Sequence, residues 1–258
     1  MIIQIDLMAV KPYKEKSDSK KVQVRSMFDH IAPRYDFLNH FLSIGIDKWW
    51  RKKAVYMLKE KKNAFILDVA TGTADLAIRA RRTLSPHRII GIDISEKMLG
   101  IGRQKIKRKM IDNIELLYGD SESLGFDDNT FDAAMVAFGV RNFENLEKGL
   151  SEIYRVLKPD GKFLVLEFSR PLKFPVRQLY GFYFKQILPA IGKYFSNDSH
   201  AYTYLPESVF EFPEGDDFMN YLLRTGFVEP SWFSLTFGIA SIYIASKPQL
   251  QRDCLDPS

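Results

Sequence analysis

The chain of 258 residues is 46% hydrophobic and 27% charged, which provides enough apolar material for the core of one large domain. Its net charge of +5 is mild, so it permits an anionic surface as a partner without demanding one. No run of about 18 apolar residues would span a membrane, and no basic segment opens the chain as in a secretory signal. The single cysteine, Cys254, excludes an internal disulfide and suits the cytosol.

The first part of the chain, residues 1–22, is expected to be a flexible lead-in, because residues 11–25 are rich in lysine and lack apolar periodicity. We expect these lysines to be solvated. An amphipathic pattern follows and predicts three helices: residues 25–32 ended by Pro33, residues 35–41, and a helix that begins with Asp47 as its N-cap. These helices either cover only the edge of a sheet or also close over a ligand.

Apolar runs that alternate with helices dominate the middle of the chain. Five of them are expected to be strands: residues 64–69, 88–93, 113–120, 131–138 and 162–168. The alternation predicts an α/β fold with a doubly wound, mostly parallel sheet. A helix over residues 214–225 then precedes a strand pair, 228–235 and 240–246, and we expect the last strand to be antiparallel. The single domain is expected to span residues 23–247, with residues 248–258 as a frayed tail.

Residues 170–213 break the alternation and are rich in aromatic side chains. Nine aromatic residues lie from Lys173 to Tyr204, together with four basic residues and one acidic residue. Aromatic residues mixed with basic ones are typical of an interfacial surface or of the mouth of an apolar pocket. In the alternative, the segment is a helical subdomain whose aromatic residues form a core. We expect it to be an insertion that covers the substrate.

A cofactor crevice is predicted at residues 64–75, where a buried strand, a turn of small residues and a helix start follow one another. Gly72 lets the backbone turn sharply and approach a ligand. Asp93 ends the next strand, 21 positions after Gly72 (93 − 72), where an acid can accept both ribose hydroxyls of an adenosine. In the alternative, Asp93 only caps the following helix. Since the turn has one glycine and a pyrophosphate needs three, the pattern favours S-adenosylmethionine over a dinucleotide.

Four motifs resemble the class I S-adenosylmethionine-dependent C-methyltransferases of ubiquinone and menaquinone synthesis. They are MFDHIAPRYDFLN (residues 27–39) continued by LSIGIDKWWR (42–51), LDVATGTAD (67–75), FGVRN (138–142) and YRVLKPDGKFLVLEFSRP (154–171). The second motif alone indicates only a methyltransferase, whereas the other three together are specific. The resemblance covers roughly residues 22–247.

This resemblance implies a class I methyltransferase fold with N-terminal helices and S-adenosyl-L-methionine as the cofactor. Thr73, Asp93, Asp120 and Ser121 fall where the family contacts the cofactor. Asp93 is then expected to hold the ribose, and Asp120 with Ser121 to face the adenine edge. Asp68 lies beneath the crevice, where it either orients Thr73 or the methionine amine or only fixes the loop.

Three positions depart from the family pattern. Ala74 stands where the family often has glycine, Asp160 where glycine is usual, and Ala137 where some members have serine. We therefore do not carry over the serine contact. None of the three changes removes an essential charge, so S-adenosylmethionine stays the expected cofactor. No metal is expected.

Methyl transfer to a ring carbon of a quinol, the reaction that the resemblance implies, needs a polarised or deprotonated hydroxyl. Such a hydroxyl titrates like a phenol, near a pKa of roughly 10. Arg141 and Asn142 follow the fourth predicted strand and are expected to face that oxygen. Because arginine stays protonated, we assign Arg141 the stabilisation of the developing phenolate. Asp120 or a water is expected to accept the proton, and Tyr35 either caps the ring or only packs.

Demethylmenaquinol, a naphthoquinol, is the first choice of substrate, and a polyprenyl methoxy-benzoquinol is the alternative. The polyprenyl tail is expected to lie along the aromatic residues of 170–205. This placement would explain transient contact of a cytoplasmic protein with the inner face of the membrane. The sequence is also compatible with a homodimer.

Three other functions compete with this interpretation. A nucleic-acid amino methyltransferase would carry an acid or Asn, then Pro-Pro and an aromatic, after the fourth strand. Residues 137–142 read AFGVRN instead, so we expect no nucleic-acid partner. A non-catalytic cofactor-binding protein would not need charges at Asp93, Asp120 and Arg141. A nicotinamide oxidoreductase would need the missing glycines.

Overall fold

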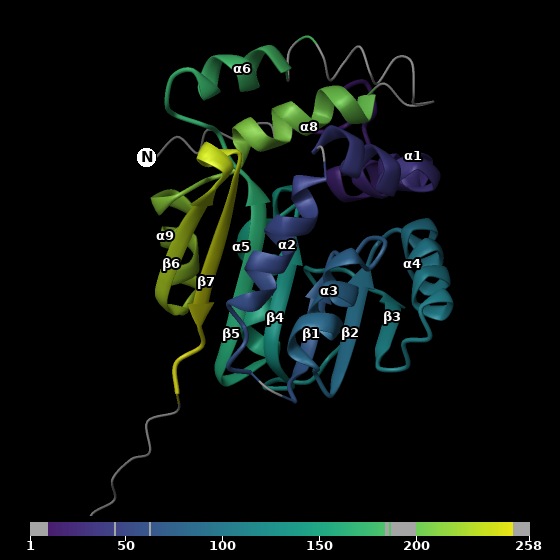
Figure 1. The fold of residues 1–258 in the computed structure, drawn as a ribbon, viewed down its shortest axis with the longest axis vertical. Coiled ribbons are helices and arrows are strands. Elements are labelled where there is room, and N and C mark those ends of the chain that lie inside the picture. Colours follow the sequence, from purple (N-terminus) through teal and green to yellow (C-terminus); the bar gives the residue numbers. More distant parts are fainter. Residues whose placement is uncertain (1–9, 44, 62, 184–185, 187–199, 250–258) are drawn as a thin grey trace, which may run out of the picture.

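One seven-stranded sheet, with strand order β3-β2-β1-β4-β5-β7-β6, forms the centre of the protein (Figure 1). The computed structural model describes residues 10–43, 45–61, 63–183, 186 and 200–249. The strands are β1 (Phe65–Val69), β2 (Arg88–Asp93), β3 (Ile114–Tyr118), β4 (Phe131–Ala137), β5 (Leu157–Phe168), β6 (Val228–Leu235) and β7 (Ala240–Ser246). β1 to β5 pair in parallel, and β7 is antiparallel to both β5 and β6. The predicted α/β fold with an antiparallel last strand is confirmed.

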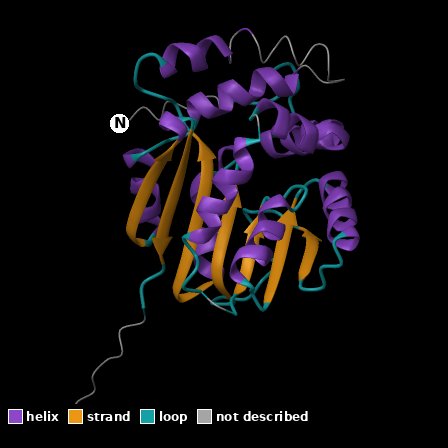
Figure 2. Ribbon diagram, viewed as in Figure 1, coloured by secondary structure: helices purple, strands orange, loops and turns teal. Residues whose placement is uncertain are grey.

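Helices cover both faces of the sheet and one of its ends (Figure 2). They are α1 (Lys20–Leu42), α2 (Ile46–Tyr56), α3 (Asp75–Leu84), α4 (Glu96–Arg108), α5 (Leu146–Val156), α6 (Val176–Phe182), α8 (His200–Glu211) and α9 (Asp216–Thr225), with the 3-10 turns η1 (Val140–Asn142) and η3 (Thr236–Gly238). Side chains of α2, α3 and α4 form one core cluster with the sheet, and those of α5 and α9 form another. No described helix has both the length and the apolar character that crossing a bilayer requires.

The central strands are buried on both faces, which explains why each consists mainly of apolar residues. Along β1, Ile66 joins the cluster that contains α2 and α3, whereas Leu67 and Val69 join the cluster that contains α5. Burying one such side chain contributes about 1.5–3 kcal/mol. This burial aligns the carboxyl ends of β1, β2 and β4 at one edge, where their loops can share a ligand.

α1 is a single helix of 23 residues that continues through Pro33. The predicted end of a helix at Pro33 and the separate helix over 35–41 are therefore wrong. A proline inside a helix removes a hydrogen bond and costs about 3 kcal/mol. Contacts on both sides of Pro33 offset this cost, because Asp29 and Asp36 both bond to loops at the edge of the sheet.

The start of α1 also differs from the expectation of a solvated lysine-rich segment. Lys20 is buried, and its ammonium donates hydrogen bonds to the backbone carbonyls of Arg141 and Phe143. Burial lowers the pKa of Lys20, against the attraction of Glu211. α1 thus begins inside the predicted lead-in of residues 1–22. The domain limits at residues 23 and 247 stay predictions.

Two further boundaries are set by backbone geometry. Gly45, not Asp47, is the N-cap of α2, because Gly45 adopts a left-handed φ of 75° that favours glycine. β5 begins at Leu157, five residues before the predicted start at residue 162. Leu157 pairs with Phe131, and residues 158–161 then bulge out of the ladder before Lys162 pairs with Ala133.

α1, α6 and α8 lie across the carboxyl ends of the parallel strands, at the top of Figure 1. Buried residues hold this layer together: Val24, Met27, Tyr180, Ala201, Tyr202 and Tyr204. Phe174 and Phe182, by contrast, are 81% and 60% exposed. The described aromatic residues of the predicted insertion thus divide between a core and a surface. Phe184, Tyr194 and Phe195 lie outside the described residues.

Candidate active site

Two neighbouring cavities lie at the carboxyl ends of the parallel strands. The first is lined by α1 and by the loops after β1, β2, β3 and β4. The second is lined by α1, α2, η1 and α8. Phe28, Tyr35 and Phe138 line both cavities, so a shared aromatic wall divides them.

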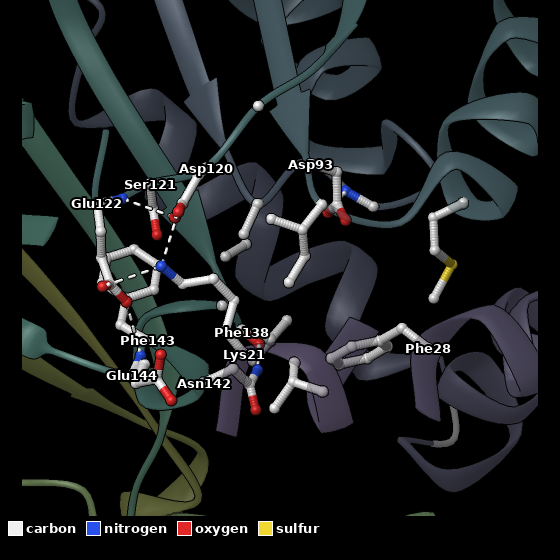
Figure 3. Close-up of a pocket in the computed structure, with 18 of the residues that line it drawn as sticks. Lys21, Phe28, Asp93, Asp120, Ser121, Glu122, Phe138, Asn142, Phe143 and Glu144 are labelled. Atoms are coloured by element: carbon white, nitrogen blue, oxygen red, sulfur yellow. Dashed lines mark hydrogen bonds and ion pairs between the residues drawn. The ribbon is translucent and has the colours of Figure 1, made fainter. Parts of the chain in front are cut away.

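Asp93 lies at the end of β2 and lines the first cavity (Figure 3). Its Oδ2 accepts a hydrogen bond from the Gly72 amide at 2.8 Å, and its Oδ1 accepts one from the Ser95 amide at 2.8 Å. Burial raises the pKa of Asp93 to about 6, against these two hydrogen bonds. The carboxylate therefore holds the loops after β1 and β2 together while it faces the cavity.

The backbone is strained where it passes the first cavity. Ala70, Gly72 and Phe138 line the cavity with φ values of 52°, 56° and 59°, in the left-handed region. Ala74, in the same loop, has a φ of 65°. A Cβ on Gly139 would lie 2.7 Å from the Ala70 side chain, so the two loops approach too closely for a larger residue. Such strain is concentrated at ligand sites more than elsewhere.

Asp120 and Ser121 line the first cavity from the loop after β3, opposite Asp93 in Figure 3. Lys21 of α1 reaches across and donates to Asp120 Oδ2 at 2.7 Å and to Glu122 Oε2 at 3.1 Å. Burial disfavours the charge on Lys21, but hydrogen bonds to the two acids raise its pKa overall. Lys21 thus closes the end of the cavity at which the sequence predicts that adenine binds.

α1 bonds to each of the three loops that carry the predicted cofactor residues. Lys21 holds the loop after β3, Asp29 accepts a hydrogen bond from Ser95 Oγ at 2.6 Å, and Asp36 accepts one from Thr73 Oγ1 at 2.5 Å. Asp29 and Asp36 lie 8 and 15 residues after Lys21 in α1, so the three side chains share one side of the helix. The N-terminal helix therefore closes over the first cavity in addition to covering the sheet.

Thr73 and Asp68 support the loop after β1 and do not line either cavity. Thr73 is buried and also accepts a hydrogen bond from Lys105, which pairs with Asp36 and Asp75 as well. Asp68 is fully buried, and its Oδ2 accepts a hydrogen bond from Thr71 Oγ1 at 2.6 Å. Its Oδ1 has no hydrogen-bond partner among the described residues.

Replacing Asp68 with asparagine is expected to remove a pH dependence of stability. Burial raises the pKa of Asp68 to about 7 from an ordinary 3.8, against the hydrogen bond from Thr71. Between pH 4 and 7 the folded protein then keeps a proton that the unfolded chain has released. The free energy of unfolding should therefore fall by a few kcal/mol (order of magnitude) as pH rises through this window, and level off above it.

Urea unfolding of both proteins at pH 4 to 8 measures this effect. The stability of Asp68→Asn relative to the native protein should increase with pH up to about 7. If the free energies of unfolding of the two proteins change in parallel with pH, Asp68 has the same pKa in the folded and unfolded states and the prediction is wrong.

η1 follows β4 and directs two side chains to different cavities. Asn142 lines the first cavity, and its Oδ1 accepts a hydrogen bond from the Tyr204 hydroxyl at 3.1 Å. Arg141 lines the second cavity and forms an ion pair with Glu167 at 2.6 Å. The Arg141 side chain is only 7% exposed and Glu167 is fully buried. Arg141 and Asn142 were predicted to face one quinol oxygen. The structure places them in the walls of different cavities, Asn142 in the first and Arg141 in the second.

The second cavity contains polar residues that sequence patterns alone did not single out as functional. Asp47 and Arg51 of α2 form a buried ion pair, and Ser43 Oγ donates to Asp47 Oδ1 at 2.7 Å. Their spacing of four residues is a signal that could have indicated one helical face. No cluster of three or more His, Cys, Asp or Glu side chains suited to a metal occurs in the described part of the chain.

Comparison with known proteins identifies the family. The model of the ubiE/COQ5 methyltransferase family matches residues 14–247, which is most of the chain. The chain belongs to the ubiE/COQ5 methyltransferase family. The match includes α1, both cavities and the strand pair β6–β7.

Curated members of the ubiE/COQ5 family resemble the chain over nearly their whole length. The demethylmenaquinone methyltransferase of Bacteroides fragilis is 49% identical over 240 residues, which are 92% of this chain and 97% of that protein. The ubiquinone/menaquinone biosynthesis C-methyltransferase UbiE of Geotalea daltonii is 46% identical over 234 residues, 90% of this chain and 99% of that protein.

A solved SAM-dependent methyltransferase from Thermotoga maritima superposes with a TM-score of 0.60 and 20% identity, over 86% of this chain and 99% of that one. At this identity the likeness shows the fold alone. The fold of this ubiE/COQ5 member is therefore the class I methyltransferase fold.

The first cavity suits S-adenosylmethionine in its chemistry. Asp93 stands at the end of β2, where a carboxylate can accept ribose hydroxyls, and Asp120 can accept from the adenine amino group. Apolar residues supply much of the remaining wall: Val24, Phe28, Ile94, Met98, Phe138 and Phe143. A few polar groups in an apolar cavity are typical of cofactor sites.

Proposed function

We propose that the protein methylates a ring carbon of demethylmenaquinol with S-adenosylmethionine, in menaquinone biosynthesis. Membership in the ubiE/COQ5 methyltransferase family supports the reaction class. The 49% identity to a protein named demethylmenaquinone methyltransferase supports the naphthoquinol. C-methylation of a polyprenyl methoxy-benzoquinol, which the name of the Geotalea daltonii relative also covers, is the alternative.

The first cavity is the proposed cofactor site. Asp93 would hold the ribose and Asp120 with Ser121 the adenine, while Gly72 lets the backbone approach the methionine part. Asp68 and Thr73 would act from beneath, by holding the loop after β1. When bound, S-adenosylmethionine supplies an electrophilic methyl group whose bond to sulfur breaks with both electrons left on sulfur.

The second cavity is the proposed quinol site. Its wall is mainly aromatic and aliphatic, and Tyr35 lies on the boundary with the cofactor cavity, where it can cover the ring. Arg141 would stabilise negative charge on the quinol oxygen, although Glu167 already balances part of its charge. Asn142 would orient the ring from the boundary, held by the Tyr204 hydroxyl. Together these groups exclude water and align the ring.

The observation that carries this proposal is the pair of cavities with one shared aromatic wall, in a chain of this family. Mass spectrometry of quinones from cells that lack the protein tests it. Demethylmenaquinone should accumulate and menaquinone should disappear, and the gene supplied in trans should reverse both changes. Accumulation of a desmethyl methoxy-benzoquinone would support the alternative substrate. An unchanged quinone profile would contradict both.

We also propose transient contact with the inner face of the membrane, as delivery of a polyprenyl substrate requires. Leu172, Phe174 and Phe182 are 80%, 81% and 60% exposed in and before α6. Lys173 and Arg177 in the same stretch carry charges that suit anionic lipid. A cytoplasmic location, the absence of a nucleic-acid partner and a homodimer stay predictions.

A further inference from the structure

Among the described residues that line the second cavity, one carries a carboxylate, and this residue is Asp47. Asp47 lies in the first turn of α2 and is 3% exposed. Arg51, one turn further along α2, pairs with Oδ2, and Ser43 donates to Oδ1. The carboxylate is therefore held in one orientation, in a cavity whose other lining residues are mainly aromatic or aliphatic.

C-methylation of a quinol must release a proton within reach of the ring, and other nearby acids are badly placed to accept it. Asp120 lines only the first cavity, as do Asp93, Glu122 and Glu144. Glu167 is fully buried, paired with Arg141, and lines neither cavity. Hydroxyls and cations line the second cavity besides Asp47: Tyr35, Ser43, Arg51, Arg141, Tyr202 and Tyr204. Each of these is a weaker proton acceptor than a carboxylate.

We propose that Asp47 is the proton acceptor for the quinol hydroxyl, in place of Asp120. This assignment depends on the proposed function, because it gives Asp47 a role in the same reaction. Asp47 takes the hydroxyl proton as the adjacent ring carbon forms its bond to the methyl group, which leaves a ketone at that oxygen. The ring carbon then loses its hydrogen to water as a proton, and the oxygen recovers a proton from Asp47. One proton is released in total, and no oxidant or reductant is needed.

Arg51 and Ser43 position the carboxylate of Asp47 and do not themselves react in this scheme. A guanidinium that pairs with one carboxylate oxygen leaves further lone pairs on both oxygens. Arg141 faces the same cavity from η1, so its charge can stabilise the phenolate while Asp47 holds the proton. Acceptor and stabiliser thus come from different elements that the fold brings together at one cavity.

Turnover of Asp47→Asn tests the proposal first. Its kcat on demethylmenaquinol should fall by about 100- to 10,000-fold, the usual contribution of a general base. Calorimetric affinity for S-adenosylhomocysteine should stay within about twofold, because Asp47 does not line the first cavity. Asp47→Glu, which keeps a carboxylate, should retain more activity than Asp47→Asn. Turnover of Asp47→Asn within threefold of the native protein would overturn the proposal.

Asp132→Asn is a matched control. Asp132 also pairs with a cation, Lys158, at 2.8 Å, but it lies near the start of β4, at the end of the strand away from the cavities. Its turnover should be unchanged. If the native protein methylates neither quinol, the proposed function fails; if it is active and Asp47→Asn is equally active, only the role of Asp47 fails.

Binding of two probes separates a reacting carboxylate from a structural one, without turnover. 1-Naphthol carries a hydroxyl that can donate to Asp47, whereas 1-methoxynaphthalene does not. The native protein should bind 1-naphthol about tenfold more tightly, and this preference should largely vanish in Asp47→Asn. Equal loss of affinity for both probes would indicate a collapsed cavity, and an unchanged preference would overturn the proposal.

Discussion

Replacing Arg141 with alanine is expected to lower turnover by about 100-fold or more and to destabilise the fold by about 3–5 kcal/mol. The guanidinium pairs with Glu167, which is fully buried, and Arg141 Nη1 also donates to the Phe138 carbonyl at 2.6 Å. Without Arg141, Glu167 would be left as a buried charge without its cation. Urea unfolding measures the loss of stability, and kcat on the quinol measures the loss of phenolate stabilisation.

A double variant separates these two effects. Arg141→Met with Glu167→Leu replaces the buried ion pair by apolar side chains, which is often neutral or stabilising. Stability should therefore recover while turnover stays low. S-adenosylhomocysteine should still bind, because neither side chain lines the first cavity. Near-normal turnover of Arg141→Ala would refute the catalytic role of Arg141.

Replacing Asp93 with alanine is expected to weaken S-adenosylmethionine binding by about 10- to 100-fold in calorimetry. The change removes the proposed ribose acceptor. It also removes the acceptor of the Gly72 and Ser95 amides, so the loops after β1 and β2 lose their common contact. Because burial raises the pKa of Asp93 to about 6, affinity of the native protein should fall as pH drops through 6. The alanine variant should lack this step.

Glu96→Ala is the control for Asp93→Ala. Glu96 begins α4, three residues after Asp93, but its side chain is 61% exposed and pairs with Arg103 on the surface. Its loss should leave affinity unchanged. If Asp93→Ala binds the cofactor as tightly as the native protein does, Asp93 does not belong to the site.

The strand positions and the polar residues at the strand ends could be predicted, because both depend on residues that are neighbours in the chain. A strand that is buried on both faces needs a largely apolar run, and residues 89–92 and 133–137 are of this kind. Gly72 takes a φ of 56°, a conformation that costs glycine little. The acids that follow such strands, Asp93 and Asp120, then reach one edge of a parallel sheet by topology.

The layer above the sheet could not be predicted in the same way. Pro33 predicts a helix end by local rules, yet contacts of Asp29 and Asp36 with distant loops keep α1 continuous. Asp47 has the sequence features of an N-cap, but Gly45 takes that position, and only the packing of α2 brings the Asp47–Arg51 pair to the second cavity. At Pro33 tertiary contacts outweigh a local cost of about 3 kcal/mol.

The sequence by itself determined the α/β class, the strand positions, and the placing of Gly72, Asp93 and Asp120 at strand ends, because short apolar runs and turn residues encode them. Only the tertiary structure decided which side chains share a cavity. Lys21 meets Asp120 across 99 positions of sequence, and Arg141 meets Glu167 across 26. Contacts over such separations form when whole helices and strands pack, so no local pattern can specify them.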